Sequence, residues 1–229
     1  LYIIERMEEN GFITKEQAAA AKQEELKIRT AASSLNTHAD YVSEMARQLM
    51  FAQYGNDIYT RGLNVYTTIR ASDQQAAYFA LRRGIMDYER RQHYRGPEKF
   101  ITLPTNPAEQ EDVIDDALID QGDKGDLLAA VVLEATPKKV RAVRRNSEVI
   151  EITGEGLQPV QSGLSDKAAP NIKLRPGALI RVTKTVKNTW EITQLPEVEG
   201  AFVSVDPRDG AIHALVGGFD FDKNKFNHV

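Results

Sequence analysis

Residues 200–229 read GAFVSVDPRDGAIHALVGGFDFDKNKFNHV, and this stretch decides how the rest of the chain is interpreted. Ala201–Val205 alternates small or apolar residues in the manner of a strand, and Ala211–Val216 is a nearly continuous apolar run, typical of a strand covered on both faces. Between them, proline presets one backbone angle, aspartates can bond neighbouring amides, and glycine accepts a positive φ. The pattern predicts a β-hairpin whose second strand is a central one.

A second informative block is residues 62–91, GLNVYTTIRASDQQAAYFALRRGIMDYERR. Its first part, Leu63–Ile69, alternates apolar and polar residues that favour β structure, which predicts a half-buried strand. A helix is expected directly afterwards, because Ser72 and Gln75 have the spacing of a capping box. The apolar stripe along one face of this helix consists of Ala77, Leu81, Ile85 and Tyr88.

These two blocks, with Lys225, Phe226 and Asn227, resemble the start of the transpeptidase domain in class A, 1A-like penicillin-binding proteins. Relatives often carry aspartate where this chain has Arg70, which affects only a strand end. In that family the nucleophilic serine lies in an S-x-x-K motif shortly after the matching asparagine, and the resemblance implies that this chain stops before it. No serine here is followed three residues later by lysine, and an unassisted hydroxyl is a poor nucleophile, so no catalytic residue is expected.

The N-terminal part is predicted to form a helical hairpin. Leu1, Ile4 and Met7 share one helical face, and Asn10-Gly11 ends that helix. A second helix is expected to start at a capping box of Thr14 and Gln17 and to run to about Leu26. Residues 5–22, ERMEENGFITKEQAAAAK, resemble the end of the family's glycosyltransferase domain. Residues 30–39 lack periodicity and are interpreted as a linker.

A third helix is predicted from about Asp40 to Tyr54, ended by Gly55. Its apolar positions are Tyr41, Val42, Met45 and Leu49.

Between Pro97 and Pro196 the pattern changes to short strands. We predict an acidic helix at Ala108–Asp120, with Val113, Ala117 and Leu118 as its apolar side. The predicted strands are Leu127–Ala135, Lys138–Asn146, Glu148–Thr153, Ala178–Val186 and Thr189–Leu195, with a helical or irregular crossover at Leu157–Asn171. Five twisted strands with a break after the third indicate a small OB-type barrel, because closure removes unpaired edges. The resemblance implies the OB-like domain that many 1A-type enzymes carry inside the transpeptidase domain.

The predicted fold is therefore α+β, with an OB-like five-stranded β-barrel inserted into an incomplete penicillin-binding transpeptidase α/β element and preceded by N-terminal helices. The predicted division is as follows: residues 1–54, helical end of the glycosyltransferase domain and linker; 55–97, first strand and helix of the transpeptidase domain; 98–197, the insert; 198–229, continuation of the transpeptidase domain.

No cofactor-binding or metal-binding residues are expected. The chain contains no cysteine, which excludes disulfides and thiolate metal sites. Asp120, Asp123 and Asp126 surround two glycines, but their spacing misses the alternate-residue ligands of an EF-hand, so we interpret them as a polar hairpin loop. The histidines are scattered without ligand spacing, at His38, His93, His213 and His228, and we interpret His213 as a packed or interfacial histidine.

Two short matches to family motifs are rejected. Ser34-Leu35-Asn36 fits S-x-N, but in the family that motif follows the nucleophile. Lys184-Thr185 begins like K-T-G, but Val186 occupies the position of the glycine.

Charge argues against a chain built to coat nucleic acid, because the net charge is -4 and the pI about 5.7. The arginines of the 62–95 region are interpreted as a solvated helix face, because acidic residues are mixed among them: Arg82, Arg83, Arg90, Arg91 and Arg95. A free-standing OB-type module for single-stranded nucleic acid remains the alternative, since the predicted insert is locally basic. Base stacking needs aromatic platforms, however, and the insert offers only Trp190.

The resemblance implies a non-catalytic part of a peptidoglycan synthase at the periplasmic face of the inner membrane. Its parent would be anchored by an N-terminal transmembrane helix that this chain lacks, and would act on peptidoglycan precursors. The insert would orient the glycosyltransferase and transpeptidase domains and offer a docking surface to a regulatory protein.

Overall fold

The computed structural model describes residues 2–23 and 37–229, which fall into two units, Leu1–Asn36 and Thr37–Val229. The first unit contains α1 (Tyr2–Glu9) and α2 (Lys15–Gln23). Its predicted capping box is confirmed, because the Thr14 amide donates to Gln17 Oε1 at 2.8 Å and the Gln17 amide to Thr14 Oγ1 at 3.3 Å. The predicted end of the second helix at Leu26 and residues 30–36 of the predicted linker lie outside the described residues.

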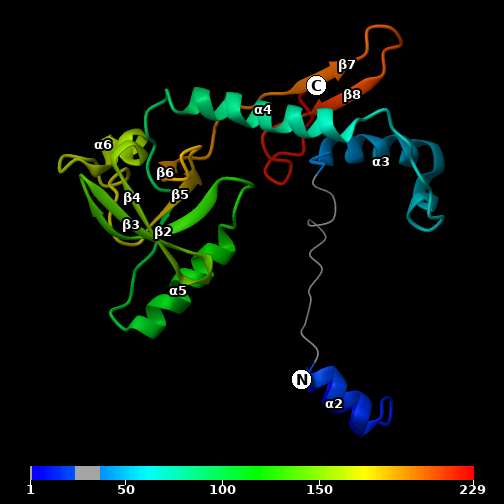
Figure 1. Ribbon diagram of the computed structural model, residues 1–229, viewed down its shortest axis with the longest axis horizontal. Helices are drawn as coiled ribbons and strands as arrows, with labels where there is room; N and C mark the ends of the chain where they lie inside the picture. The colour runs from blue at the N-terminus through cyan, green and yellow to red at the C-terminus, as the bar shows by residue number, and fades with distance from the viewer. Residues whose placement is uncertain (1, 24–36) are drawn as a thin grey trace. The chain divides into compact units, whose positions relative to one another are not determined.

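The second unit contains a six-stranded antiparallel sheet (Figure 1). Its strands are β1 (Lys99–Phe100), β2 (Leu128–Thr136), β3 (Lys139–Arg144), β4 (Glu148–Thr153), β5 (Ala178–Lys184) and β6 (Trp190–Thr193). The five predicted strands are confirmed at nearly their predicted bounds, whereas β1 was not predicted. Between β4 and β5 the chain forms the 3₁₀ segment η4 (Gly154–Val160) and the short helix α6 (Gln161–Leu164), which confirms the predicted crossover.

The prediction of a closed five-stranded barrel is wrong. Strand β5 pairs with β2 along one edge and with β1 and then β6 along the other, while the opposite edge of the sheet ends at β4. No hydrogen-bonded ladder joins β4 to β6 in the described part of the chain. The backbone of η4 lies against β6 instead, since a Cβ on Gly156 would collide with the Trp190 carbonyl oxygen. Covering an edge with another segment is an alternative to closing it.

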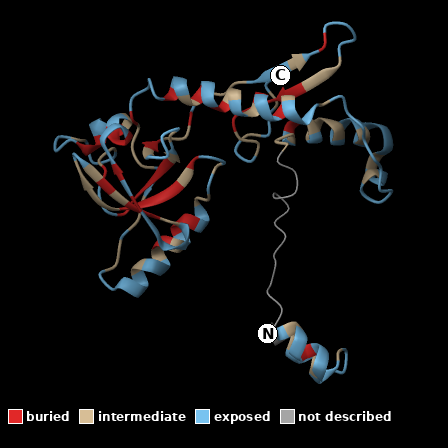
Figure 2. Ribbon diagram, in the orientation of Figure 1, coloured by how far each residue is buried: buried red, intermediate tan, exposed pale blue. Residues whose placement is uncertain are grey.

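Hydrophobic residues are buried on both faces of this sheet (Figure 2). Alternation along β2 directs Ala130 and Val132 to one cluster and Ala129 and Val131 to the other. The first cluster includes η4 and α6, and the second is covered by α5 (Pro107–Asp120). The acidic helix is thus confirmed, with Ala117 and Leu118 buried as part of its apolar side, but Ile114 is buried in place of Val113.

The segments before and after the sheet contribute helices and a hairpin. They are α3 (Asp40–Tyr54), η2 (Gly55–Tyr59), α4 (Ala71–Glu89), β7 (Phe202–Val205) and β8 (Ile212–Val216). The predicted hairpin is confirmed, and its turn uses Gly210 at φ 78°. Helix α4 packs on it through Ala77, which lies against Ala214 and Val216.

The predicted strand at Leu63–Ile69 is not formed. The segment approaches β8 only at its end, where Thr68 Oγ1 donates to the Ile212 carbonyl at 2.7 Å and the Arg70 amide to the His213 carbonyl at 2.9 Å. These two bonds make no ladder, so β7 and β8 form a two-stranded sheet and β8 is not a central strand. Because both bonds lie at the C-terminal end of the segment, the backbone groups earlier in Leu63–Ile69 have no described strand to pair with.

One finer prediction about the flanking helices is also wrong. Helix α4 begins at Ala71 without a side-chain cap, and the Ser72 hydroxyl donates to Asp73 rather than capping with Gln75. On α3, Tyr41 is buried but Leu49 is 70% exposed. Tyr88, at the end of the apolar stripe of α4, is 42% exposed. Among the described residues, no helix is both long and apolar enough to cross a bilayer.

Candidate functional site

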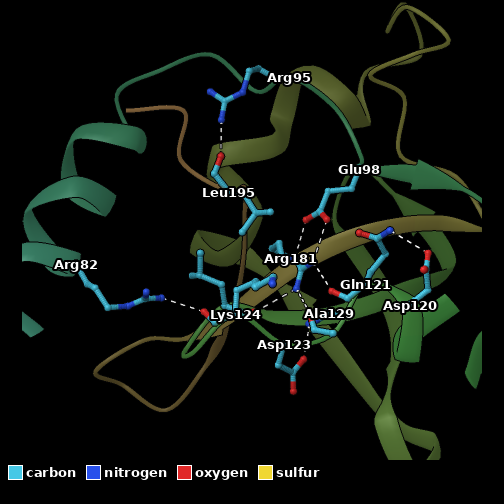
Figure 3. Close-up of polar contacts among 12 residues, drawn as sticks. Arg82, Arg95, Glu98, Asp120, Gln121, Asp123, Lys124, Ala129, Arg181 and Leu195 are labelled. Carbon is cyan, nitrogen blue, oxygen red and sulfur yellow. Dashed lines mark hydrogen bonds and ion pairs between the residues drawn. The ribbon is translucent and has the colours of Figure 1, made fainter. Parts of the chain in front are cut away.

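Arg82, on α4, connects three parts of the second unit. Its side chain is only 4% exposed, and its Nε lies 2.9 Å from Asp126 Oδ1. Nη2 donates to the Lys124 carbonyl at 3.0 Å (Figure 3). Nη1 donates to the Phe219 carbonyl at 2.8 Å. The guanidinium carbon also lies 3.9 Å from the centroid of the Phe219 ring, within cation–π range. One side chain thus joins α4, the 121–126 loop before β2 and the loop after β8.

The prediction that the arginines of this region form a solvated face is wrong for Arg82. A signal was present, because Gln74, Arg82 and Glu89 continue the buried stripe of Ala77 and Ile85. All these residues are buried on one side of α4, where a helical period places them. The partners of Arg82 lie far away along the chain, so the spacing alone could not identify them.

A second polar cluster lies where the chain leaves α4 and where it returns from the sheet. Glu89 is 2% exposed, and its Oε1 lies 2.5 Å from Arg95 Nη1 and accepts from Gln194 Nε2 at 2.8 Å. Gln194 Oε1 accepts from the Arg95 amide at 3.0 Å, and Arg95 Nη2 donates to the Leu195 carbonyl at 2.7 Å (Figure 3). Nearby, Arg90, the residue directly after α4, pairs with Glu191 on β6 at 2.7 Å. The segment that leaves α4 and the segment that follows β6 are therefore hydrogen-bonded to each other.

The loop after β8 is also held by α3. Tyr41 donates its hydroxyl to the Asn224 carbonyl at 2.8 Å, and the Phe219 amide donates to Glu199 Oε2 at 3.2 Å. A Cβ on Gly217 or Gly218 would collide with the Asn227 side chain or the Tyr41 hydroxyl, respectively. These close approaches explain why glycine occupies both positions.

Tyr41 should make stability depend on pH in the alkaline range. Burial, followed by the charges of Glu199 and Asp220, raises the pKa of Tyr41 to about 12. The folded state therefore binds the phenolic proton more tightly than the unfolded state does, so the stabilisation is complete below about pH 10 and is lost as pH rises towards 12. We expect a phenolate absorbance titration of the wild type minus Tyr41→Phe to give a midpoint near 12. A midpoint at the ordinary tyrosine value would contradict the buried position.

The three aspartates before β2 have separate partners. Asp123 Oδ1 accepts from the Ala129 amide at 2.8 Å, Asp126 binds Arg82, and Asp120 lies 3.5 Å from Lys99 Nζ. Asp123 and Asp126 lie in the loop before β2, as predicted, whereas Asp120 is the last residue of α5. In residues 2–23 and 37–229, no group of three or more acidic or histidine side chains is arranged to hold a metal ion.

The other residues singled out in the sequence are not brought together. His38 stacks on Tyr78 with ring centroids 3.8 Å apart. His213 is half-buried, and its backbone carbonyl accepts a hydrogen bond from the Arg70 amide. Ser34-Leu35-Asn36 lies outside the described residues. Lys184 ends β5 with its Nζ 5.1 Å from the centroid of the Trp190 ring, and Val186 is fully exposed.

The fold and this site define a β-sheet insert fastened to a helix–hairpin element. Residues 94–198 match the family model of the penicillin-binding protein OB-like domain. The chain is 34% identical over 234 residues to penicillin-binding protein 1A of Escherichia coli (strain K12), covering 99% of this chain and 27% of the relative. Against penicillin-binding protein 1A of Neisseria meningitidis serogroup B, identity is 36% over 236 residues, covering 100% of this chain and 28% of the relative.

A solved structure of penicillin-binding protein 1A from Haemophilus influenzae matches 99% of this chain and 32% of that chain, with a TM-score of 0.76 at 28% identity. Over its whole length the chain is therefore similar to 1A-type penicillin-binding proteins, as the sequence blocks predicted, and residues 94–198 match their OB-like domain. The chain spans a little over a quarter of the length of the curated relatives from Escherichia coli and Neisseria.

Proposed function

We propose that this chain is a segment of a bifunctional peptidoglycan synthase, in which the OB-like insert orients the glycosyltransferase and transpeptidase domains and offers regulators a docking surface. The synthase would act at the periplasmic face of the inner membrane, anchored by a transmembrane helix in another part of the protein. Under this proposal residues 1–54 belong to the glycosyltransferase end and linker, 55–97 and 198–229 to the transpeptidase domain, and 98–197 to the insert. The segment itself needs no cofactor.

The observation that supports an orienting role best is the set of bonds made by Arg82. A buried guanidinium that binds two carbonyls and a carboxylate fixes geometry, because each bond constrains both distance and direction. The Glu89–Arg95–Gln194 cluster adds a second point of attachment. Together, these two attachments restrict rotation of the insert more than the two chain connections alone would.

The orienting role is tested in a full-length synthase carrying this segment. Because Arg95 and Leu195 are hydrogen-bonded, residues 98–193 can be replaced by a short glycine–serine linker without stretching the chain. We expect this variant to keep its acylation by a labelled penicillin, which serves as the control for folding, and to form fewer cross-links per unit of glycan polymerised. Wild-type cross-linking in the shortened enzyme would contradict the orienting role.

The chain itself should not react with penicillin. Acylation needs a serine activated by a lysine one helical turn away, and no serine of this sequence has that neighbour. After incubation with a labelled penicillin, we expect intact-mass measurement to show the unmodified chain. Stoichiometric acylation would mean that a nucleophile exists here.

The structure gives less support to the alternative of single-stranded nucleic-acid binding. Arg144 and Lys184 each lie 5.1 Å from the centroid of the Trp190 ring, so the aromatic platform is already in contact with cations. On β3, Lys139 and Arg141 lie 3.8 Å and 3.7 Å from Glu151 and Glu134, respectively. Bases need an open aromatic face and phosphates need free cations. Salt-sensitive binding of oligonucleotides at physiological ionic strength would revive this alternative.

A further inference from the structure

Arg181 is a charged residue in the middle of an apolar strand. It lies on β5 between Ile180 and Val182, and its side chain is only 1% exposed. Its Nε and Nη2 bind the two carboxylate oxygens of Glu98 at 2.5 Å and 2.9 Å. Nη1 and Nη2 also donate to the carbonyls of Gly122 at 2.5 Å and Gln121 at 2.7 Å (Figure 3).

Packing alone does not explain an arginine at this position. An ion pair taken out of water carries a desolvation cost that an apolar residue of similar volume avoids. The planar fork of arginine is suited instead to holding several acceptors in fixed directions. Here those acceptors include consecutive backbone carbonyls, those of Gln121 and Gly122.

The same short loop carries the acceptors of Arg82. Residues 121–126 present the Gln121 and Gly122 carbonyls to Arg181, and the Lys124 carbonyl and Asp126 carboxylate to Arg82. Within the loop region, a β-bridge joins Lys124 to Leu127. Both arginines therefore bind one short, internally bonded segment from different parts of the second unit.

We propose that Arg181 is a positioning residue for Arg82, and that residues 121–126 relay changes between the interior of the insert and the loop after β8. Glu98 and Arg181 set the position of the 121–126 loop, this loop sets the guanidinium of Arg82, and Arg82 holds the Phe219 carbonyl. The inference rests on the proposed function, and it describes how binding to the insert would reach the element that flanks it.

Hydrogen exchange in the 229-residue chain tests the relay. The reporter is the Phe219 amide, which donates to Glu199 and lies far in sequence from Arg181. We expect Arg181→Met to raise its exchange rate about fivefold or more, with the amides of β3 changing less than about twofold. The matched control is Ile180→Val, which removes one methylene group from the core beside Arg181 without altering a loop contact. It should leave the Phe219 rate within about twofold of the wild type.

A double-variant comparison separates a relay from general destabilisation. If Arg181 acts through Arg82, then Arg181→Met in the Arg82→Met background should change the Phe219 rate by less than about twofold. Full multiplication of the two single effects, or equal effects of Arg181→Met and Ile180→Val, would overturn the relay. If Arg181→Met does not fold, Glu98→Gln is expected to raise exchange in the 121–126 loop and at Phe219 together; a change in the loop alone would also overturn it.

The outcome for Arg82 distinguishes the relay from the proposed function. Faster exchange of the Phe219 amide in Arg82→Met but not in Arg181→Met would reject only the relay. It would leave standing the proposal that the bonds of Arg82 attach the insert, which we call the Arg82 joint. An unchanged exchange rate of the Phe219 amide in Arg82→Met would count against the Arg82 joint itself.

Discussion

Replacing Arg82 by methionine is expected to lower the free energy of unfolding of the second unit by about 3 kcal/mol. Methionine fills much of the same space but donates no hydrogen bond, so the Phe219 carbonyl loses its Arg82 donor, while the Lys124 carbonyl keeps only the Leu127 amide as a donor. A polar group left buried without a partner costs about 1–3 kcal/mol. Asp126 is 59% exposed and can return to water, so its lost ion pair adds little. Denaturant unfolding followed by circular dichroism measures the change.

Arg83 provides the matched control for this experiment. It is the next residue on α4, carries the same charge and is exposed. We expect Arg83→Met to change the free energy of unfolding by no more than about 0.5 kcal/mol, as is usual for surface substitutions. Equal losses of unfolding free energy in the two variants would show that the Arg82 joint adds no stability beyond the charge that an arginine brings to the helix.

The second large effect is expected for Gly177→Ala. Gly177 has φ 85°, donates its amide to the Val132 carbonyl at 2.8 Å and accepts from the Ile101 amide at 2.8 Å. A Cβ there would overlap the Ile101 carbonyl oxygen, so the added methyl group must displace a backbone segment next to β1 as well as occupy a left-handed conformation. We expect the free energy of unfolding to fall by at least about 3 kcal/mol.

Gly210 separates the two causes. It has a similar φ of 78°, but a Cβ built there meets nothing within 4 Å. Gly210→Ala should therefore cost only the backbone strain, about 1 kcal/mol. The difference between the two variants measures the steric conflict at Ile101. If both variants lost the same stability, the close approach between Gly177 and Ile101 would be wrong.

Local patterns predicted most of the elements. The strands of the insert are predicted because β-branched residues alternate between turn residues, and α5 because Val113, Ala117 and Leu118 form an apolar side on an acidic segment. The Asn106 side chain accepts from the Ala108 amide at 3.1 Å, so the cap is made within the local sequence. These features depend on neighbours a few residues apart.

What the sequence did not predict depends on distant contacts. Closure was expected from the number of strands, but Lys99–Phe100 occupies part of the free edge of β5, and η4 packs against β6. Leu63–Ile69 has the alternating pattern of a strand, but a strand also needs a neighbouring strand to pair with, and the pattern cannot show whether one lies alongside. Arg82 was assigned to solvent because charge usually indicates exposure, whereas its acceptors lie 42, 44 and 137 residues away.

The central claim is that polar contacts hold the insert in one orientation on α4. The chain has no cysteine, so spin labels can be attached only at introduced sites, Gln75→Cys on the exposed face of α4 and Lys167→Cys on the insert. Electron–electron distance measurement should give one narrow distribution in the otherwise wild-type chain and a broad one when Arg82→Met and Glu89→Gln are combined. A broad distribution in the otherwise wild-type chain, or an unchanged narrow one after both substitutions, would contradict the claim.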